Sequence, residues 1–304
     1  MKTAHSSILL TSLLLLGACA GDPRPPAAAA PLAAAPLAGL ERITASGWGI
    51  ADAETGEIVA AKEATTPLKS ASITKVMTAL LVTELAARQP EVLDETVTFS
   101  EAAVERVGSK SGLRALESLS VRDTLYALML PSGNDAGYAL AQHFGERLTP
   151  GSPANSGKGF IAAMNRKAQS LGMKDTIYRS SFGDGGTVND RTTTVHDLMI
   201  LARAATAQPL LKQVFGTRTF ATQARTADGE SRHVSWSNTH RLLGDPNVSG
   251  IKTGTTKTAG ACLLTEMTID GRRYHIVVLG SQGSQQRYVD TLMIAEHVKA
   301  LKRS

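Results

Sequence analysis

The chain has 304 residues, enough for one large domain or two small ones, and 42% of them are hydrophobic. This composition supplies a sizeable core and excludes a disordered chain. The formal net charge of +5 is mild and is not clustered along the sequence, so it gives no reason to expect nucleic-acid binding.

The first 18 residues have the features of an export signal. One positive charge at Lys2 precedes an apolar stretch, Ile8–Leu16, that is too short to span a bilayer as a helix. The next residues complete the sequence LGAC, which ends at Cys19 and resembles a bacterial lipobox, whose cysteine is lipidated and becomes the new N-terminus. We expect residues 1–18 to be a lipoprotein signal peptide and Cys19 to anchor the chain to a membrane. Plain secretion with an incidental cysteine is the alternative.

A proline-rich segment follows the cysteine. Residues 20–39 carry five prolines among alanines, which discourages helix and strand and favours an extended tether. About 20 such residues reach roughly 60 Å at about 3.1 Å each. We therefore expect residues 19–39 to be a tether and residues 40–304 to be the folded domain.

Secondary-structure patterns begin just after the tether. Two short β-prone runs within residues 45–62 flank Glu54-Thr55-Gly56 and predict a hairpin. From Ser72, apolar residues recur at three- and four-residue spacing, which predicts a helix with one buried face. These apolar residues are Val76, Met77, Leu80, Leu81 and Leu85.

The middle and the end of the chain differ in pattern. Residues 90–240 are predicted to be mostly helical, and the expected segments are 121–144, 159–171 and one after Thr194. The end shows three β-prone runs and a final helix. These are residues 248–255, 259–269 and 274–281, with Asp270-Gly271 as the turn between the last two runs, and residues 285–302.

Strands at both ends and helices between them predict an α+β fold. We expect an antiparallel sheet of about five strands, flanked by helices, with a mainly helical subdomain inserted in the sequence. Cys262 lies in an apolar run of the sheet and has no disulfide partner if Cys19 is lipidated. We expect it to be a buried small hydrophobic residue.

Three short motifs carry candidate chemistry: Ser72-Ile73-Thr74-Lys75 (S-x-x-K), Ser132-Gly133-Asn134 (S-x-N) and Lys252-Thr253-Gly254 (K-T-G). The first pattern occurs again at Ser249–Lys252. On a helix, residues three apart share a face, whereas on a strand they point to opposite faces. Because Ser72 opens a predicted helix and Ser249 lies on a predicted strand, we expect only Ser72 to meet its lysine.

A serine hydroxyl needs a base to become a nucleophile, and a lysine is a base only when it is neutral. Lowering a lysine pKa from about 10.4 to near 7 costs about 4 to 5 kcal/mol. Burial and a second cation can lower a lysine pKa in this way, and Lys252 is that cation if its strand runs beside the Ser72 helix. We therefore expect Ser72 to be an acyl-transfer nucleophile and Lys75 to be its base.

The other two motifs are weak when each is taken alone. Ser132-Gly133-Asn134 follows an apolar run, where a hydroxyl would relay a proton and an amide would hold a substrate carbonyl, yet these are also ordinary turn residues. Lys252-Thr253-Gly254 also fits an edge strand that carries a lysine. All three motifs in this order, on a helix start, a loop and a strand, are typical of class A β-lactamases and penicillin-binding proteins.

The sequence around the motifs resembles the D-alanyl-D-alanine carboxypeptidase family of low-molecular-mass penicillin-binding proteins, over about residues 40 to 304. The resemblance implies a β-lactamase/DD-peptidase-like fold. It also implies a serine peptidase of the cell wall that removes the terminal D-alanine from peptidoglycan stem peptides ending in D-Ala-D-Ala. It implies inhibition by β-lactams, no cofactor and no metal. The matching segments are 71–78, 131–136, 250–256 and 259–262, with Met164-Asn165, Leu171-Gly172-Met173 and Asn238-Thr239 between them.

The resemblance also implies a role for each catalytic residue. Ser72 would form the acyl-enzyme and Lys75 would deprotonate it. Ser132 and Lys252 would pass the proton to the leaving D-alanine. The backbone N–H groups of Ser72 and Thr255 would form the oxyanion hole.

Substrate binding is implied in the same way. Asn134 would hold the acyl-side amide, and Thr253 and Arg287 would bind the terminal carboxylate, although Arg287 is also compatible with a surface arginine. The substrate-binding set is Asn134, Thr253, Gly254, Thr255 and Arg287. Residues 179–186 stand where the family usually has an N-x-x-G-L-like stretch, and they differ from it. This difference affects the expected substrate subsites more than the expected catalytic residues.

Other functions share some of these sequence features. A class A β-lactamase needs a glutamate to activate water, and residues 155–190 contain none, so we expect a slowly reversed penicillin adduct. A D,D-endopeptidase that cuts peptidoglycan cross-links carries the same motifs, so this function remains an alternative. A silent peptidoglycan-binding lipoprotein would not need Ser72, Lys75 and Lys252 together. An α/β-hydrolase would need G-x-S-x-G and a zinc peptidase H-E-x-x-H, and the sequence has neither.

The lipobox also suggests a location. A lipidated Cys19 would hold the domain in the cell envelope, facing the periplasm. Because Ala20 follows the cysteine instead of an aspartate, we expect the outer membrane if the cell has two membranes.

Overall fold

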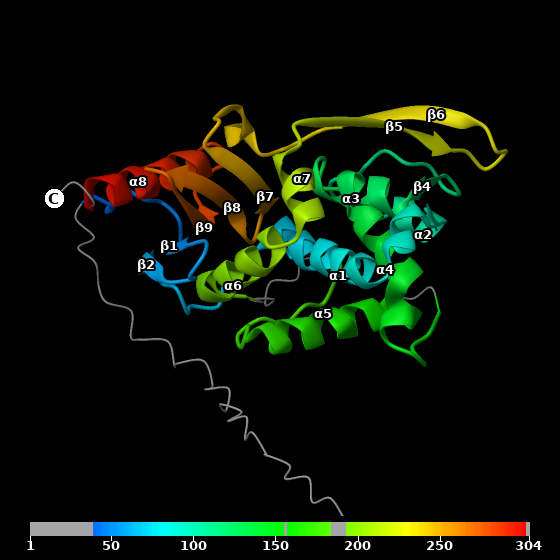
Figure 1. The fold of residues 1–304 in the computed structure, drawn as a ribbon, viewed down its shortest axis with the longest axis horizontal. Helices are drawn as coiled ribbons and strands as arrows, with labels where there is room; N and C mark the ends of the chain where they lie inside the picture. Colours follow the sequence, from blue (N-terminus) through cyan, green and yellow to red (C-terminus); the bar gives the residue numbers. More distant parts are fainter. Residues whose placement is uncertain (1–38, 155–156, 184–192, 302–304) are drawn as a thin grey trace, which may run out of the picture. The chain divides into compact units, whose positions relative to one another are not determined.

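Two strands from the start of the domain and three from its end form one antiparallel sheet, in the order β2-β1-β9-β8-β7 (Figure 1). They are β1 (Gly47–Asp52), β2 (Ile58–Lys62), β7 (Val248–Thr256), β8 (Gly260–Ile269) and β9 (Arg272–Ser281). This computed structural model describes residues 39–154, 157–183 and 193–301. The predicted signal peptide, Cys19 and all of the tether except Gly39 lie outside the described residues.

Local sequence explains two of the hairpins of this sheet. Between β1 and β2, a carboxylate oxygen of Asp52 accepts hydrogen bonds from the backbone N–H groups of Glu54 and Thr55, both at 2.9 Å. Between β8 and β9, Asp270 and Gly271 have φ angles of 47° and 77°, the left-handed pair that a two-residue hairpin turn requires. Both predicted hairpins are confirmed.

Side chains alternate between two buried layers along the central strand β9. Ile276 and Val278 pack in one apolar cluster with helix α8 (Gln286–Leu301). Val277 and Leu279 lie in the other cluster, with helix α6 (Val195–Thr206) and the helical part of the chain. The sheet is therefore covered on both faces (Figure 1).

Helix α1 (Lys75–Arg88) is the central helix of the remaining fold. Most of its side chains are buried, because it contacts five other helices. These are α3 (Val121–Met129), α4 (Asn134–Leu148), α5 (Lys158–Leu171), α6 and α7 (Pro209–Gly216). A 3₁₀ turn, η1 (Ala71–Thr74), precedes α1, so Ser72 lies in this turn and not in the first turn of the α-helix.

The middle of the chain also holds a second sheet that the sequence analysis missed. Its four strands run in the order β3-β4-β5-β6. They are β3 (Thr96–Thr98), β4 (Ser118–Ser120), β5 (Thr219–Arg225) and β6 (Ser231–Ser237); the short elements η2 (Pro90–Asp94), α2 (Glu101–Val104) and η3 (Arg241–Gly244) complete the fold. Phe220 of β5 stacks on Tyr126 of α3 with ring centroids 3.8 Å apart, which attaches this sheet to the helices.

Candidate active site

The three motifs meet where η1 lies beside strand β7. A side chain at Gly254 would place its Cβ only 2.7 Å from the carbonyl oxygen of Ser70 and 3.0 Å from the backbone nitrogen of Ser72. Glycine at this position therefore allows β7 to approach the turn that carries Ser72. The backbone of the K-T-G motif is in this way brought against the first motif.

Ser72 and Lys75 are in contact. The Lys75 side-chain nitrogen, Nζ, lies 2.9 Å from Ser72 Oγ, 2.7 Å from Asn134 Oδ1 and 2.5 Å from the carbonyl oxygen of Phe182. Lys75 is completely buried, whereas Ser72 is partly exposed. This geometry lets Lys75 exchange a proton with the hydroxyl while substrate reaches Ser72 from outside. By contrast, Ser249 of the second S-x-x-K match is exposed on β7 and Lys252 is buried.

Lys252 is buried in surroundings where its charge is costly. Its side chain is 1% exposed, and Nζ donates to the carbonyl oxygen of Thr253 at 3.1 Å. Burial, followed by repulsion from Arg287, lowers the pKa of Lys252 to about 7. Burial and then the charge of Lys252 lower the pKa of His240 to about 3. His240 is therefore neutral, and Lys252 can hold or release a proton near neutral pH.

Ser132 lies in the loop between α3 and α4, in a strained backbone conformation. Its φ is 66°, in the left-handed region, which costs a non-glycine residue about 1–3 kcal/mol. Its hydroxyl is buried and has no hydrogen-bond partner among the described residues. The structure thus places Ser132 in a loop, as predicted, but shows no hydrogen bond from it to Lys75 or Lys252.

Asn134 connects Lys75 to a loop that borders the site. Besides accepting from Lys75, its side chain donates to the carbonyl oxygen of Val107 at 2.5 Å. The buried carboxylate of Asp135, which the sequence analysis did not select, accepts from the backbone N–H of Ser111 at 2.9 Å and from its hydroxyl at 2.8 Å. Asn134 and Asp135 together fix the position of this loop.

Three residues of the segment that departs from the family pattern also contribute to the site, and they are Ser181, Phe182 and Gly183. Thr78 donates its hydroxyl to the carbonyl oxygen of Ser181 at 2.5 Å, which fixes the segment to α1. The carbonyl of Phe182 then reaches Lys75. Gly183 has a φ of 118°, and a Cβ there would lie 2.6 Å from the carbonyl oxygen of Ala71. The sequence gave only one signal for the contact between this segment and Lys75. Thr78 and Lys75 are three residues apart and therefore share a face of α1.

Arg287 is buried, which excludes the surface-arginine alternative. Its Nη1 donates to the carbonyl oxygen of Gly254 at 3.1 Å and to Thr255 Oγ1 at 2.8 Å. The hydroxyl of Thr253 lies 2.7 Å from that of Thr239, a residue that the sequence analysis had noted only as part of a similar stretch. Cations and hydroxyls therefore gather along the end of β7 that faces the turn of Ser72.

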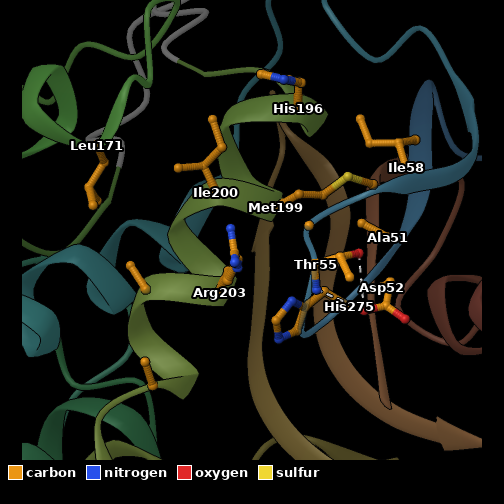
Figure 2. A pocket seen from close by; sticks show the side chains of 13 residues that line it. Ala51, Asp52, Thr55, Ile58, Leu171, His196, Met199, Ile200, Arg203 and His275 are labelled. Carbon is orange, nitrogen blue, oxygen red and sulfur yellow. Dashed lines mark hydrogen bonds between the residues drawn. The ribbon is translucent and has the colours of Figure 1, made fainter. Parts of the chain in front are cut away.

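A pocket of about 680 Å³ opens at Ser72. Asn134, Phe182, Gly183 and Thr255 line it, and Glu105, Arg106 and Lys257 bring charges to it. A second pocket, of about 480 Å³, lies between α6 and the β1–β2 hairpin (Figure 2). Its described lining includes His196, Met199 and Arg203 but no residue of the three motifs.

The described residues hold neither a metal-binding cluster nor a membrane-spanning helix. Within them, no group of three or more His, Cys, Asp or Glu side chains is placed to hold a metal ion. No helix in the same part of the chain has the length and apolarity needed to cross a membrane. Cys262 is fully buried, as predicted.

Comparison with known proteins identifies the family. The model of the D-alanyl-D-alanine carboxypeptidase family, peptidase family S11, matches residues 32–283. The D-alanyl-D-alanine carboxypeptidase of Streptomyces sp. (strain K15) is 33% identical over 99% of this chain and 99% of its own length. The D-alanyl-D-alanine endopeptidase of Pseudomonas aeruginosa is 32% identical over 93% of this chain and 83% of its own.

Solved structures agree with the sequence relatives. The crystal structure of the Streptomyces K15 DD-transpeptidase superposes with a TM-score of 0.77 at 32% identity, covering 85% of this chain and 98% of that one. This likeness confirms the predicted α+β, DD-peptidase-like fold. By sequence and by fold, the chain belongs to the D-alanyl-D-alanine carboxypeptidase family.

Proposed function

We propose that this chain is a serine D-Ala-D-Ala carboxypeptidase that removes the terminal D-alanine from peptidoglycan stem peptides. The observation that carries the proposal is the 2.9 Å contact between Ser72 Oγ and the buried Lys75 Nζ, at the mouth of a pocket, in a member of this family. A hydroxyl within hydrogen-bond reach of a base is the arrangement typical of nucleophilic acyl transfer, and Lys75 Nζ is the base here.

The reaction has two steps. Neutral Lys75 takes the hydroxyl proton while Ser72 Oγ attacks the carbonyl carbon of the penultimate D-alanine. The C–N bond then breaks, Ser132 and Lys252 pass the proton from Lys75 to the leaving amine, and D-alanine departs. Lys75, neutral again, takes a proton from a water molecule as the water oxygen attacks the acyl-enzyme ester. The ester C–O bond then breaks, the proton goes from Lys75 to Ser72 Oγ, and the shortened peptide is released. In a β-lactam the same attack opens the ring, and the leaving amine stays tethered, which slows the second step.

Backbone and side-chain donors around Ser72 support the binding roles. The N–H groups of Ser72 and Thr255 stabilise the oxyanion, and the loss of one such donor costs about 2.7–4 kcal/mol. Thr253 and Arg287 bind the terminal carboxylate, for which buried cationic and hydroxyl donors are suited. Asn134 aligns the acyl-side amide. The close approach of Gly254 to Ser72 supports this arrangement.

We also propose that the enzyme is a lipoprotein of the cell envelope that faces the periplasm. The short apolar stretch ending in LGAC at Cys19 supports this proposal, and residues 19–39 would be the tether. Several acyl chains on Cys19 would give stable anchoring, because a single chain binds membranes only marginally. The substrate, peptidoglycan, lies in the same compartment.

A second candidate is D,D-endopeptidase activity on peptidoglycan cross-links. The relatives from Pseudomonas aeruginosa and Escherichia coli that are named endopeptidases are 32% and 31% identical over 93% and 92% of this chain. The bond broken has the same acyl side, a D-alanine carbonyl, and only the leaving amine is larger. The Ser72 chemistry is therefore common to both reactions.

One experiment tests both activities. Residues 40–304 are incubated with pentapeptide muropeptides and cross-linked dimers, and the products are followed by mass. Ser72→Ala should abolish turnover, whereas Ser249→Ala, the serine of the second S-x-x-K match, should leave it unchanged. Free D-alanine with persisting dimers supports the carboxypeptidase, and conversion of dimers to monomers supports the endopeptidase. If the wild type does neither, the acyl-transfer proposal is wrong.

A further inference from the structure

Thr239 contacts three parts of the site at once. Its backbone N–H donates to the carbonyl oxygen of Leu130 at 3.1 Å, two residues before Ser132. Its carbonyl oxygen accepts from the Tyr288 hydroxyl on α8 at 3.0 Å. Its hydroxyl oxygen lies 2.7 Å from that of Thr253 in the K-T-G strand. The backbone of Thr239 is thus held from two sides while its side chain meets Thr253.

The hydroxyls of Thr239 and Thr253 carry two protons, and the hydrogen bond between them uses only one. In the described part of the chain, neither hydroxyl has another hydrogen-bonding partner. Thr253 is 5% exposed and Thr239 is exposed, so the pair lies at the surface, where an acceptor from outside can reach it. The pair therefore has one proton available for an acceptor from outside the protein.

The surroundings favour an anionic acceptor. Arg287 and Lys252 are buried next to this strand end, and Arg287 already donates to Gly254 and Thr255. A carboxylate is an acceptor-only group, and its hydrogen bonds are stronger than those of neutral acceptors. An ester or amide at the same place has less negative charge to offer the hydroxyl.

We propose that Thr239 is a positioning residue for the substrate's terminal carboxylate. Thr239 donates its proton to Thr253 Oγ1, which leaves the Thr253 proton directed at the carboxylate of the departing D-alanine. The inference deepens the proposed function and rests on it. It makes Thr239 a determinant of specificity for peptides that end in a free carboxylate.

The test uses two thioesters that acylate Ser72 through the same acyl group. One has a thioglycolate leaving group with a free carboxylate, and the other is its methyl ester. The full chain is compared with Thr239→Val, which keeps the shape without the hydroxyl, and with Thr239→Ser, which restores it. Thr222→Val is the matched control, because Thr222 also donates its hydroxyl, to Asp123 at 2.7 Å, but on β5.

Thr239→Val should lower kcat/KM for the carboxylate thioester about tenfold, mainly through KM, and leave the methyl ester unchanged. Thr239→Ser should restore most of the loss, and Thr222→Val should change neither rate. Equal losses on both thioesters, or no loss on either, would overturn the inference while leaving the proposed function intact. A wild-type chain that hydrolyses neither thioester would overturn the proposed function and this inference with it.

Discussion

Lys252 shows how a single buried side chain links stability to chemistry. Its pKa of about 7 in the folded chain lies below the usual lysine value of 10.5, first because of burial and second because of Arg287. Protonated Lys252 therefore destabilises the folded state. This penalty is complete below about pH 7 and disappears as the pH rises towards the unfolded value, since the unfolded chain then holds the extra proton. The same shift provides a proton donor and acceptor near neutral pH.

Replacing Arg287 with glutamine tests this electrostatic coupling. Arg287→Gln removes a positive charge beside Lys252, so the pKa of Lys252 should rise and the pH profile of Ser72 acylation should move to higher pH. Lost hydrogen bonds to Gly254 and Thr255 should also slow acylation about tenfold. Acylation by a fluorescent penicillin, measured as a function of pH, gives both quantities.

The control for this prediction is Arg241→Gln, an exposed arginine whose guanidinium donates to Gln285 at 2.9 Å. Its pH profile should match that of the wild type. An Arg287→Gln profile that does not move would mean that Arg287 has no electrostatic influence on the group that limits acylation.

At the scale of elements, sequence patterns predicted local structure well and contacts between distant segments poorly. The i, i+3 spacing of Ser72 and Lys75 sufficed to predict their contact, and Asp270-Gly271 sufficed for a hairpin. The Phe182 carbonyl comes from a segment without periodicity, so its place beside Lys75 follows only from tertiary packing. The second sheet was missed because β3 and β4 have only three residues each. Asp228-Gly229, between β5 and β6, was a usable hairpin signal.

Gly183 tests how far this segment supports the nucleophile. In Gly183→Ala the new Cβ would lie 2.6 Å from the carbonyl oxygen of Ala71, so the turn that carries Ser72 must shift. We expect β-lactam acylation to fall at least about 100-fold, because an ångström of misplacement can cost this much. Stopped-flow acylation kinetics would measure the loss.

Gly172→Ala is the matched control for the glycine prediction. Gly172 also has a left-handed backbone, with a φ of 82°, but no atom lies within 4 Å of its ideal Cβ. It should lose about 1 kcal/mol of unfolding free energy, read from urea denaturation, with unchanged acylation. If both variants acylate at the wild-type rate, the segment does not position Ser72.

At the scale of the whole molecule, the order of elements predicted the architecture. Strands at both ends of the domain imply one sheet that the two ends complete together, and β1 and β9 are indeed neighbours. Sequence patterns cannot place Arg287 beside Lys252, because the two lie on a helix and a strand whose packing is decided by many apolar contacts. The burial of Arg287 was for this reason visible only in the structure.

The proposed membrane attachment belongs to the same scale. Cys19→Ser removes the thiol that would carry the lipid, so the protein should move from the membrane to the soluble fraction and lose incorporation of labelled palmitate. Hydrolysis of soluble muropeptides should remain within about twofold of the wild type, since Cys19 precedes the folded domain. Cys262→Ser should keep the label, and a Cys19→Ser variant that stays labelled would contradict the lipoprotein proposal.

The pairing of β1 with β9 also sets a time at which this protein can fold. Trp48 pairs with Val278, about 230 residues later in synthesis. At roughly 5–20 residues per second, the ribosome needs about 12–46 s to make that stretch. During this interval β1 has no partner on its β9 side, and a chain that stops before Arg272 never acquires one. The nascent chain therefore cannot complete its five-stranded sheet until β9 has been made.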